Sequence, residues 1–299
     1  MNSIAVVGSI NMDLVVETDI SPKMGQTILG NNFFMSPGGK GANQAVAAAR
    51  LGGNICIFGS LGRDENGMQM KSNLQKEGIE IKHINYVENV PTGVAVIELC
   101  SNDNRIIVVQ GANNFTNITY LEKVKEELLS FDVIIMQMEI PIEAIEYIVS
   151  FLYENKKTIV LNPAPALPLK KELIEKVTYI TPNEHEYKII LNTEENMEEA
   201  LRRYPNKLIV TQGSQGVKYF DGANIITVPC IKVEAIDTTG AGDTFSGAFS
   251  VAISEGRSLF ESISFANIAA GISVTQKGAQ GGMPKREAVD RVFNITEEK

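Results

Sequence analysis

The chain has 299 residues, of which 44% are hydrophobic and 21% are charged, and its formal net charge is −9. This composition is typical of a globular chain with one large core, and it excludes a disordered chain. The acidic balance disfavours nucleic acid or an anionic membrane as a partner, and the lack of any run of 18 apolar residues excludes a transmembrane helix.

Short apolar runs rich in β-branched residues alternate with helical patterns along the chain. The first run has no basic segment before it and is predicted to be a strand, not part of a signal peptide. The alternation predicts an α/β fold with a mainly parallel sheet. The expected strands are Ile4–Gly8, Ile55–Gly59, Val133–Gln137, Thr158–Asn162, Thr178–Thr181 and Leu208–Thr211. The expected helices are Asn43–Leu51, Glu65–Glu77, Ile142–Asn155, Lys171–Lys176, Glu194–Tyr204, Asp243–Glu255, Leu259–Gln276 and Lys285–Phe293.

Two stretches, Leu14–Phe34 and Thr92–Gln110, hold strand-like segments with no helix between them. Their segments are Leu14–Glu17, Val94–Leu99 and Arg105–Val109, and a turn at Ser101–Asn104 predicts a hairpin between the last two. We expect a small β-sheet that projects over the main domain as a lid. No linker or repeat is visible, so residues 1–299 are expected to form a single domain with lid segments at about 14–36 and 91–111.

Cysteine and histidine are scarce. The three cysteines, Cys56, Cys100 and Cys230, lie far apart in or beside strand-like runs, which predicts reduced, buried thiols in a cytoplasmic protein. With only His83 and His185, and no Cys/His metal spacing, zinc sites and Ser-His-Asp chemistry are disfavoured.

The strongest local motif is Asp237–Phe245, which precedes a helix of small residues. Gly240 and Gly242 allow a sharp turn, and the helix after them points its free N–H groups and positive dipole end forward. This arrangement suits a transferring phosphoryl group. Asp243, at the start of the helix, has two interpretations on this motif alone: an N-cap, or a general base that takes a proton from an attacking hydroxyl.

A second motif, Pro37–Asn43, opens an Ala-rich helix. It is not a Walker A loop, because Lys40 is followed by Gly41 where Ser or Thr is required. Lys40 and Asn43 are hydrogen-bond donors suited to a polyol. The alternative is a tight turn that packs a helix on the sheet, which explains the glycines but not Lys40 together with Asn43.

Asn11 and Asp13 follow the first strand, and ligands of open α/β sheets bind beyond strand carboxyl ends. Because they are two residues apart, both side chains would lie on one face of a strand. A carboxylate can accept hydrogen bonds from the two hydroxyls of a vicinal diol. Asp13 as a turn residue is the alternative. No G-x-G-x-x-G follows the strand, which disfavours a dinucleotide-binding dehydrogenase.

In Thr181–Glu186, the amide of Asn183 and the carboxylate of Glu186 are three residues apart and would share a face at a helix start. Such oxygen ligands suit hydrated Mg²⁺ near phosphates, but a capping box is an equally good interpretation. His185 between them is expected at the surface. The Gly-bearing loop Thr211–Gly216 follows a strand and could bracket a nucleotide.

Together these motifs resemble the ribokinase branch of the PfkB carbohydrate kinases from Ile4 to about Arg291. The segments Gly38–Ala48 and Asp237–Phe245 match the two family signatures. The resemblance implies a Rossmann-like three-layer αβα domain with a small β-sheet lid, and a homodimer clasped through the lid.

The resemblance also implies roles for individual residues. It makes Asp243 the catalytic base and Gly240, Ala241 and Gly242 the anion hole. The implied sugar contacts are Asn11, Asp13, Gly39, Lys40, Asn43, Glu139 and Asp243. The implied nucleotide contacts are Asn183, Thr211, Gly213, Gly216, Gly242 and Asn267, with Asn183 and Glu186 tied indirectly to Mg²⁺.

Ribokinases resemble one another in a monovalent-cation site, which here implies K⁺ held by Asp237, Thr239, Ser273, Gln276, Gly278 and Gly282. Gln276 and Gly282 stand where some ribokinases have a basic residue and a Ser, and Asn267 stands where some relatives have His. Carbonyl ligands survive such exchanges, whereas a side-chain ligand at position 282 would be lost.

The reaction implied by the resemblance is transfer of the γ-phosphate of ATP to O5 of D-ribose, with ATP, Mg²⁺ and K⁺ as cofactors. A deoxyribokinase is the nearest alternative, and the Asn11–Asp13 spacing resembles ribokinases more closely. A purine-nucleoside kinase is a third member of the same family. Two other classes, an NAD-dependent enzyme and a non-catalytic sugar-binding regulator, are disfavoured by the missing glycine fingerprint and by the intact Gly240–Asp243 segment.

Overall fold

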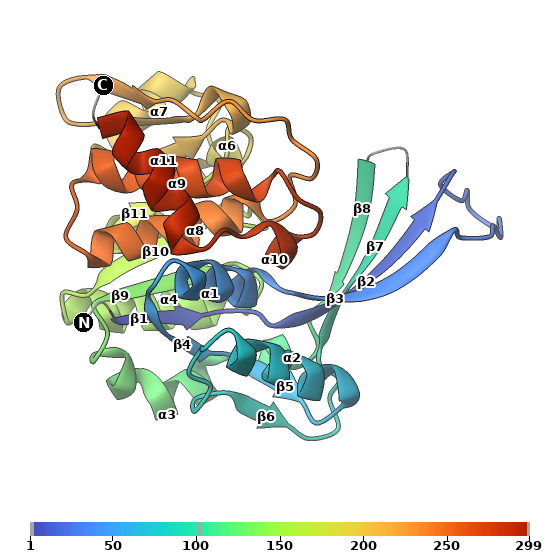
Figure 1. Ribbon diagram of the computed structural model, residues 1–299. Coiled ribbons are helices and arrows are strands. Elements are labelled where there is room, and N and C mark those ends of the chain that lie inside the picture. Colours follow the sequence, from blue (N-terminus) through green and yellow to red (C-terminus); the bar gives the residue numbers. More distant parts are fainter. Residues whose placement is uncertain (1–2, 101–102, 298–299) are drawn as a thin grey trace.

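The computed structural model describes residues 3–100 and 103–297. A body of helices around a central sheet carries a smaller sheet that projects from one side (Figure 1). The central sheet has the order β11-β10-β9-β1-β4, and every neighbouring pair in it is parallel. Its strands are β1 (Ser3–Val7), β4 (Asn54–Phe58), β9 (Val133–Gln137), β10 (Thr158–Asn162) and β11 (Tyr179–Ile180).

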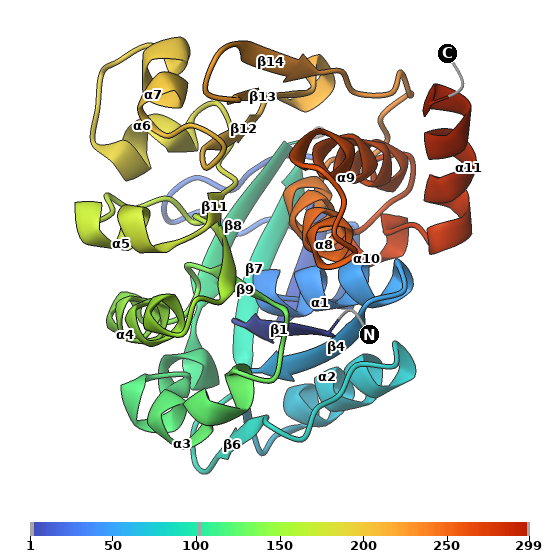
Figure 2. The same ribbon diagram turned by 90° about the vertical axis from the view of Figure 1, so that its left-hand side faces the viewer.

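Alternation along the buried strands divides the apolar side chains between two cores, as a pleated strand requires. In β1, Ile4 and Val6 enter one core, and Ala5 and Val7 enter the other. Helices cover both faces, so the body has three layers (Figure 2). One core packs under α1 (Lys40–Arg50), α2 (Glu65–Lys76), α8 (Ala241–Ser254), α9 (Leu259–Ser273) and α11 (Arg286–Glu297). The other packs under α3 (Ile118–Leu128), α4 (Ile142–Glu154), α5 (Lys171–Lys176), α6 (Glu186–Leu191) and α7 (Met197–Arg203).

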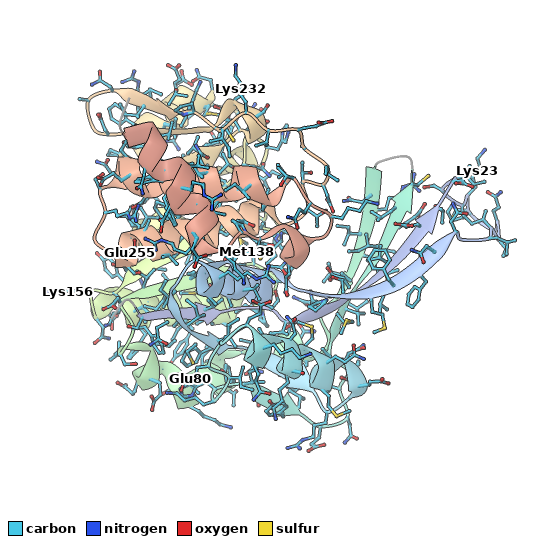
Figure 3. The ribbon with its side chains drawn as sticks, in the orientation of Figure 1. Lys23, Glu80, Met138, Lys156, Lys232 and Glu255 are labelled. Atoms are coloured by element: carbon cyan, nitrogen blue, oxygen red, sulfur yellow. The ribbon has the colours of Figure 1, made fainter. Side chains whose placement is uncertain are left out.

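The projecting sheet has the order β3-β2-β7-β8. Its strands are β2 (Asn11–Thr18), β3 (Asn32–Gly38), β7 (Gly93–Cys100) and β8 (Asp103–Val109). The pairs β2–β3 and β7–β8 are antiparallel, and β2–β7 is parallel. Lys23, in the connection between β2 and β3, lies at the outer tip, far from Glu255 on the body (Figure 3).

Two smaller strand groups complete the fold. A three-stranded antiparallel sheet contains β12 (Ile209–Thr211), β13 (Val217–Phe220) and β14 (Ile225–Val228). The parallel bridges Ile180↔Leu208 and Asn183↔Thr211 join it to the edge of the central sheet. The strands β5 (Ser60–Gly62) and β6 (Asn85–Val87) pair in parallel. Short helical segments are η1 (Gly111–Phe115), η2 (Gly213–Gln215) and α10 (Ala279–Gly282).

The predicted α/β class, the parallel central sheet and the separate small sheet are confirmed. The predicted hairpin is confirmed as β7–β8, while Ser101 and Asn102 of its turn lie outside the described residues. The predicted strand Leu208–Thr211 is confirmed as β12 from Ile209, which pairs with β13 in the antiparallel sheet and is joined to the central sheet by the two parallel bridges. The sequence patterns also missed α3, β13 and β14.

Several predicted helix ends were wrong by about one turn. α1 begins at Lys40 and not at Asn43, because Gly39 at its N-cap already turns the chain. α7 begins at Met197, where Asn196 and Glu199 form a capping box, three residues after the predicted start. α9 ends at Ser273, three residues before Gln276.

Cys56 is buried and in no disulfide, as predicted, whereas Cys100 and Cys230 are only partly buried, so the prediction of burial was wrong for those two. Cys100 ends β7 in the projecting sheet, and Cys230 lies two residues after the end of β14. Within residues 3–100 and 103–297, none of the helices combines the length and the apolar character that crossing a bilayer requires.

Candidate active site at the carboxyl ends of the parallel strands

The site begins where the order of the central sheet reverses, between β1 and β9. Such a switch point leaves a crevice beyond the strand ends. Ser9 follows β1 and donates its hydroxyl proton to Glu139 Oε2, which follows β9, at 2.6 Å. The same carboxylate oxygen accepts the backbone N–H of Lys40 at 3.1 Å. Glu139 therefore fastens the start of α1 to the floor of the crevice.

Gly39 is needed where it stands. Its φ is 86°, and a Cβ there would lie 2.6 Å from the backbone nitrogen of Asn11. The loop can therefore approach β2 only with glycine at this position. This close approach directs Lys40 into the crevice, where it lines the cavity described below.

Lys40 is surrounded by carboxyl groups. Burial alone would lower its pKa, but the charges of Asp243, Glu139, Glu186 and Asp13 raise the pKa of Lys40 above its ordinary value. Lys40 therefore remains a cation in a site that is otherwise acidic. A cation so placed can stabilise negative charge that develops on a bound group.

Asn11 and Asp13 lie on β2 with the spacing of one strand face, as predicted. Asn11 is buried; its oxygen accepts from Asn113 Nδ2 at 2.7 Å and its nitrogen lies 3.5 Å from Glu139 Oε2. Burial, with the nearby charges of Glu139 and Asp243, raises the pKa of Asp13 to about 7. Asp13 is therefore poised to change its charge near neutral pH.

α8 begins at Ala241, with Gly240 as its N-cap in a left-handed conformation at φ 77°. A Cβ on Gly240 would lie 2.9 Å from the Cα of Ala279, so the turn also needs glycine for space. Asp243 is the third residue of the helix and not its opening residue. The cap interpretation of Asp243 was wrong, because Gly240 and not Asp243 occupies the N-cap position of α8.

The Asp243 carboxylate is instead bound by two side-chain amides from α1. Asn43 Nδ2 donates to Oδ2 at 3.0 Å, and Gln44 Nε2 donates to Oδ1 at 2.9 Å. Asp243 is 6% exposed, and its position in the first turn places it at the positive end of the α8 dipole. Each oxygen keeps a lone pair that can accept a further proton.

The predicted anion hole needs one correction. The N–H of Ala241 donates to Thr238 O at 3.2 Å and so serves the turn before the helix. Gly240 and Gly242 line the cavity, whereas Ala241 does not. The N–H groups available to an anion at this end of α8 are therefore those of its glycines and of the first turn behind them.

A cavity of about 190 Å³ joins these groups to the next strands. It brings together most of the predicted residues of the phosphate side and adds several that were not predicted. Its lining residues are Lys40, Asn162, Ala164, Thr181, Asn183, Glu186, Thr211, Gly240, Gly242, Asp243 and Phe245.

Asn183 and Glu186 form reciprocal hydrogen bonds. Asn183 Oδ1 accepts the N–H groups of His185 and Glu186, each at 2.9 Å, and Glu186 Oε2 accepts the N–H of Asn183 at 2.8 Å. The prediction that the two side chains share a helical face was wrong, because α6 begins at Glu186 and Asn183 precedes it. Burial raises the pKa of Glu186, against the opposing effects of the Asn183 N–H and Lys40. His185 is exposed, as predicted.

The predicted nucleotide loop follows β12. Thr211 lines the cavity, and Gly213 and Gly216 have φ values of 51° and 88° in the turn after it. Asn267 is placed differently: it is buried in α9 and donates to the carbonyls of Val228 at 3.0 Å and Pro229 at 3.3 Å. Its side chain therefore holds the end of β14 and is not part of the cavity wall.

The predicted cation ligands come from two segments that the fold brings together. Asp237 Oδ1 accepts the N–H of Thr239 at 2.9 Å, and Oδ2 accepts the N–H of Gly278 at 2.8 Å. Burial opposes ionisation, but these hydrogen bonds, with help from the nearby Lys277, lower the pKa of Asp237. Asp237 therefore holds the two segments together as an anion.

Gly282 packs against the carbonyl of Ser273, which a Cβ at position 282 would overlap, and the carbonyl of Gln276 would lie 3.5 Å from that Cβ. A Ser would therefore not fit at 282 without movement of the backbone. Ser273 ends α9, so its carbonyl is one that the helix itself leaves without a partner. Within residues 3–100 and 103–297, no cluster of three or more His, Cys, Asp or Glu side chains could hold a metal ion.

Comparison with known proteins identifies this arrangement. Residues 1–286 match the family described as pfkB family carbohydrate kinase. The chain belongs to the PfkB family of carbohydrate kinases. It is 45% identical to the ribokinase of Bacillus subtilis over 294 residues, which cover 98% of this chain and 100% of the relative. It is 32% identical to the deoxyribokinase of Salmonella typhi, over 98% of this chain and 99% of the relative.

A solved structure of Arabidopsis thaliana ribokinase complexed with ribose and ATP superposes on this PfkB chain with a TM-score of 0.87. The two chains are 32% identical, and the match covers 98% of each. Together with the family match, these likenesses make the chain an enzyme, a sugar kinase of the ribokinase type.

Sequence reasoning missed several residues of this PfkB site. Ser9 and Asn113 hold Glu139 and Asn11, and Gln44 and Asn162 lie beside Asp243. Gln44 directly follows Asn43, the last residue of the Pro37–Asn43 motif, so its place in the sequence could have indicated a role in the site. The others are single polar residues in ordinary contexts, and only the fold brings them to the site.

Proposed function

We propose that this chain transfers the γ-phosphate of ATP to O5 of D-ribose, with Asp243 as the general base. The observation that carries the proposal is the Asp243 carboxylate, which is buried, held by two amides, and placed in the first turn of α8 beside Lys40. A hydroxyl bound between the floor and the cavity can give its proton to a remaining lone pair of Asp243. Its oxygen can then attack the γ-phosphorus of ATP in line, while the bond from that phosphorus to the β-phosphate oxygen breaks and ADP leaves.

The sugar is proposed to bind over the floor formed by β2, the Gly39 loop and Glu139. Asp13, in its ionised form, would accept hydrogen bonds from two vicinal hydroxyls, which D-ribose offers at C2 and C3. Asn11, Lys40 and Asn43 would add donors. The likeness to the B. subtilis ribokinase, which exceeds that to the S. typhi deoxyribokinase, supports ribose as the sugar.

The nucleotide is proposed to lie along the cavity, with its phosphates at the end of α8 and its remaining part toward Asn183, Thr211 and the loop of Gly213 and Gly216. In this position, the N–H groups of α8 and the ammonium of Lys40 would stabilise the transferring phosphoryl charge. Asn267 would act indirectly, through the end of β14.

Two cations fit the residues that are present. Four carboxyl groups surround Lys40, so a triphosphate here needs added positive charge, and Glu186 at the cavity wall is an oxygen donor suited to hydrated Mg²⁺. Bound Mg²⁺ would supply charge neutralisation between the phosphates. The ionised Asp237 and the carbonyls near Gly282 suit a monovalent cation such as K⁺, with Thr239, Ser273, Gln276 and Gly278 completing the set.

We also propose that the projecting sheet is a lid within a single kinase domain and that it pairs two chains in a homodimer. Large apolar side chains are exposed on it, including Phe33 at 59% and Ile107 at 67%. An exposed apolar sheet of this kind is usually covered by a partner. We propose the cytoplasm, a reducing compartment, because none of the three cysteines in the described residues forms a disulfide.

The test is release of ADP by the purified protein with ATP, Mg²⁺ and a panel of pentoses that includes D-ribose and 2-deoxyribose, with and without K⁺. We expect the highest kcat/KM with D-ribose and stimulation by K⁺. If no pentose in the panel is phosphorylated, the proposed function is wrong. If 2-deoxyribose is preferred, the assignment of Asp13 to a vicinal diol is wrong.

A further inference from the structure

The carboxylate of Asp243 lies in the middle of a row of side-chain amides. Gln280 Nε2, from α10, donates to Asn43 Oδ1 at 3.0 Å, and Gln137 Nε2, from the end of β9, donates to Gln44 Oε1 at 2.7 Å. Asn73 Nδ2, from α2, donates in turn to Gln280 Oε1 at 2.9 Å. In spatial order the row is Asn73, Gln280, Asn43, Asp243, Gln44 and Gln137.

Each amide has a donor end and an acceptor end, so a bond made at one end fixes the orientation of the other. Because Gln280 presents an N–H to Asn43, the oxygen of Asn43 faces α10 and its nitrogen faces Asp243. In the same way, Gln137 turns the nitrogen of Gln44 toward Asp243. The row thus has two arms, one from Asn73 through Gln280 to Asn43 and one from Gln137 to Gln44. In both arms each N–H donates in the direction of the Asp243 carboxylate.

The far end of the row also favours a fixed direction. Gln137 is fully buried, and its Oε1 has no hydrogen-bond partner among residues 3–100 and 103–297. Turning Gln137 round would place two amide oxygens, its own and that of Gln44, against each other. The observed orientation of Gln137 leaves its own Oε1 unpaired but avoids this contact between oxygens. It also keeps an N–H of Gln44 on Asp243.

We propose that Gln280 and Gln137 are positioning residues: they orient Asn43 and Gln44 so that Asp243 receives an N–H on each oxygen. The inference rests on the proposed role of Asp243 as the base. With one lone pair of each oxygen taken by an amide, the carboxylate plane is fixed and the remaining lone pairs serve the hydroxyl proton. Neither glutamine lines the cavity, so neither acts by touching ATP.

The test compares Gln280→Glu with Gln280→Met. A glutamate keeps the shape of glutamine, but its ionised carboxylate has only acceptors. Its oxygen would then repel the oxygen of Asn43, or Asn43 would turn and place its own oxygen against the Asp243 carboxylate. A methionine removes the polar group, and Asn43 can still donate to the carboxylate. We expect kcat to fall about 10- to 100-fold in Gln280→Glu and by a clearly smaller factor in Gln280→Met. KM for ATP should stay within about threefold in both.

A role in packing alone predicts the opposite order, because glutamate is the better isostere. Equal or greater loss of kcat in Gln280→Met would therefore overturn the proposal, as would native kcat in Gln280→Glu. Gln75→Glu is the control for added charge, since Gln75 is an exposed residue of α2 outside the row, and its kcat should stay within about twofold.

A second pair of variants covers the case that Gln280→Glu does not fold. Asn73 is only partly buried, and its Nδ2 donates to Gln280 Oε1. Asn73→Asp places an acceptor there, so Gln280 turns its nitrogen toward residue 73 and its oxygen toward Asn43. Asn73→Ala removes the donor without turning Gln280. We expect Asn73→Asp to have the lower kcat, and equal values would overturn the proposal. Failure of the proposed function is separate, because the native protein itself would then phosphorylate no pentose.

Discussion

The floor of the site and the projecting sheet are built in opposite ways. On the floor, which includes the first turns of α1 and α8, Asp243, Asn43 and Gln44 are buried. Hydrogen bonds join Asp243 to α1, and join α1 in turn to α10 and β9. Among the described residues of the projecting sheet, the buried cluster consists of Val15, Ala95 and Ile97, and several large apolar side chains are exposed. The floor is thus held together by hydrogen bonds within one chain, whereas the described part of the sheet exposes an apolar surface.

This difference matters because the two parts would respond differently to substitution. Removing one partner of a buried hydrogen bond leaves the other unpaired, at a cost of about 1–3 kcal/mol, so the floor has little freedom to rearrange. A group on an exposed strand can be exchanged with little effect on folding. The predictions below, in order of decreasing effect, test whether chemistry belongs to the floor and association to the sheet.

After substitution of Asp243 itself, the largest effect is expected from Gly240→Ala. The alanine would occupy φ 77° with its Cβ 2.9 Å from the Cα of Ala279, so the turn before α8 must shift. We expect kcat to fall about 10²-fold or more, since N–H groups aimed at developing charge are lost. The control is Gly256→Ala, which also has φ 77° but open space around it, and which should cost about 1 kcal/mol of stability with native kcat. Equal kcat in the two variants would contradict the role of this turn.

Asp13→Asn tests the sugar side of the floor. Loss of an acceptor for two hydroxyls should lower kcat/KM for D-ribose about 10- to 100-fold, because hydrogen bonds to charged groups contribute about 1.5–3 kcal/mol. In the native protein, kcat/KM should decline as pH falls through about 7, where the raised pKa of Asp13 lets it take up a proton. The pH–rate profiles of native protein and variant check this, and a decline of the same size in both would argue against Asp13.

The same group has an opposite effect on folding. Between the ordinary value of 3.8 and about 7, folded Asp13 keeps a proton that the unfolded chain has released. The bound proton therefore contributes to the free energy of unfolding at low pH. This contribution is fully present below 3.8 and is lost as pH rises through about 7. Urea unfolding at pH 5 and pH 8 should show a smaller loss of stability in Asp13→Asn than in the native protein. A larger loss in the variant would exclude this assignment.

Substitution of Ile106 and Ile107 by Lys tests the projecting sheet. Both are exposed, and consecutive residues of β8 point to opposite faces, so the double variant places charge on each. We expect the native protein to sediment as a dimer and the variant as a monomer, with a change in unfolding free energy of the separated chain of less than about 0.5 kcal/mol. A variant that remains a dimer would place the interface elsewhere.

The smallest effect is expected from Asn196→Ala, which removes the capping box of α7, remote from both regions. It should cost about 1 kcal/mol of stability and leave kcat unchanged. Thermal unfolding and the ADP-release assay together check this, and a loss of kcat would show that the floor is less independent of its surroundings than its hydrogen bonds indicate.

The sequence predicted the floor better than its supports. Glycines and a charged residue in short motifs, as in Gly39–Lys40 and Gly240–Asp243, carry their geometry locally, because backbone conformation there is restricted. Gln137 and Gln280 lie far from these motifs along the chain, and no local rule states that an amide will meet an amide across the fold. Strand partners were harder still: Thr211 pairs with Val217 in the antiparallel sheet and also forms a parallel bridge to Asn183, and no local pattern predicts either partner.

The central claim is that Asp243 takes the proton of the sugar hydroxyl. Asp243→Asn tests it most directly, because asparagine keeps the size and can still accept from one of the two amides. Single-turnover phosphoryl transfer should fall about 10²- to 10⁴-fold in this variant while the dissociation constants of D-ribose and ATP change little. Transfer at the native rate with both substrates bound would contradict the account.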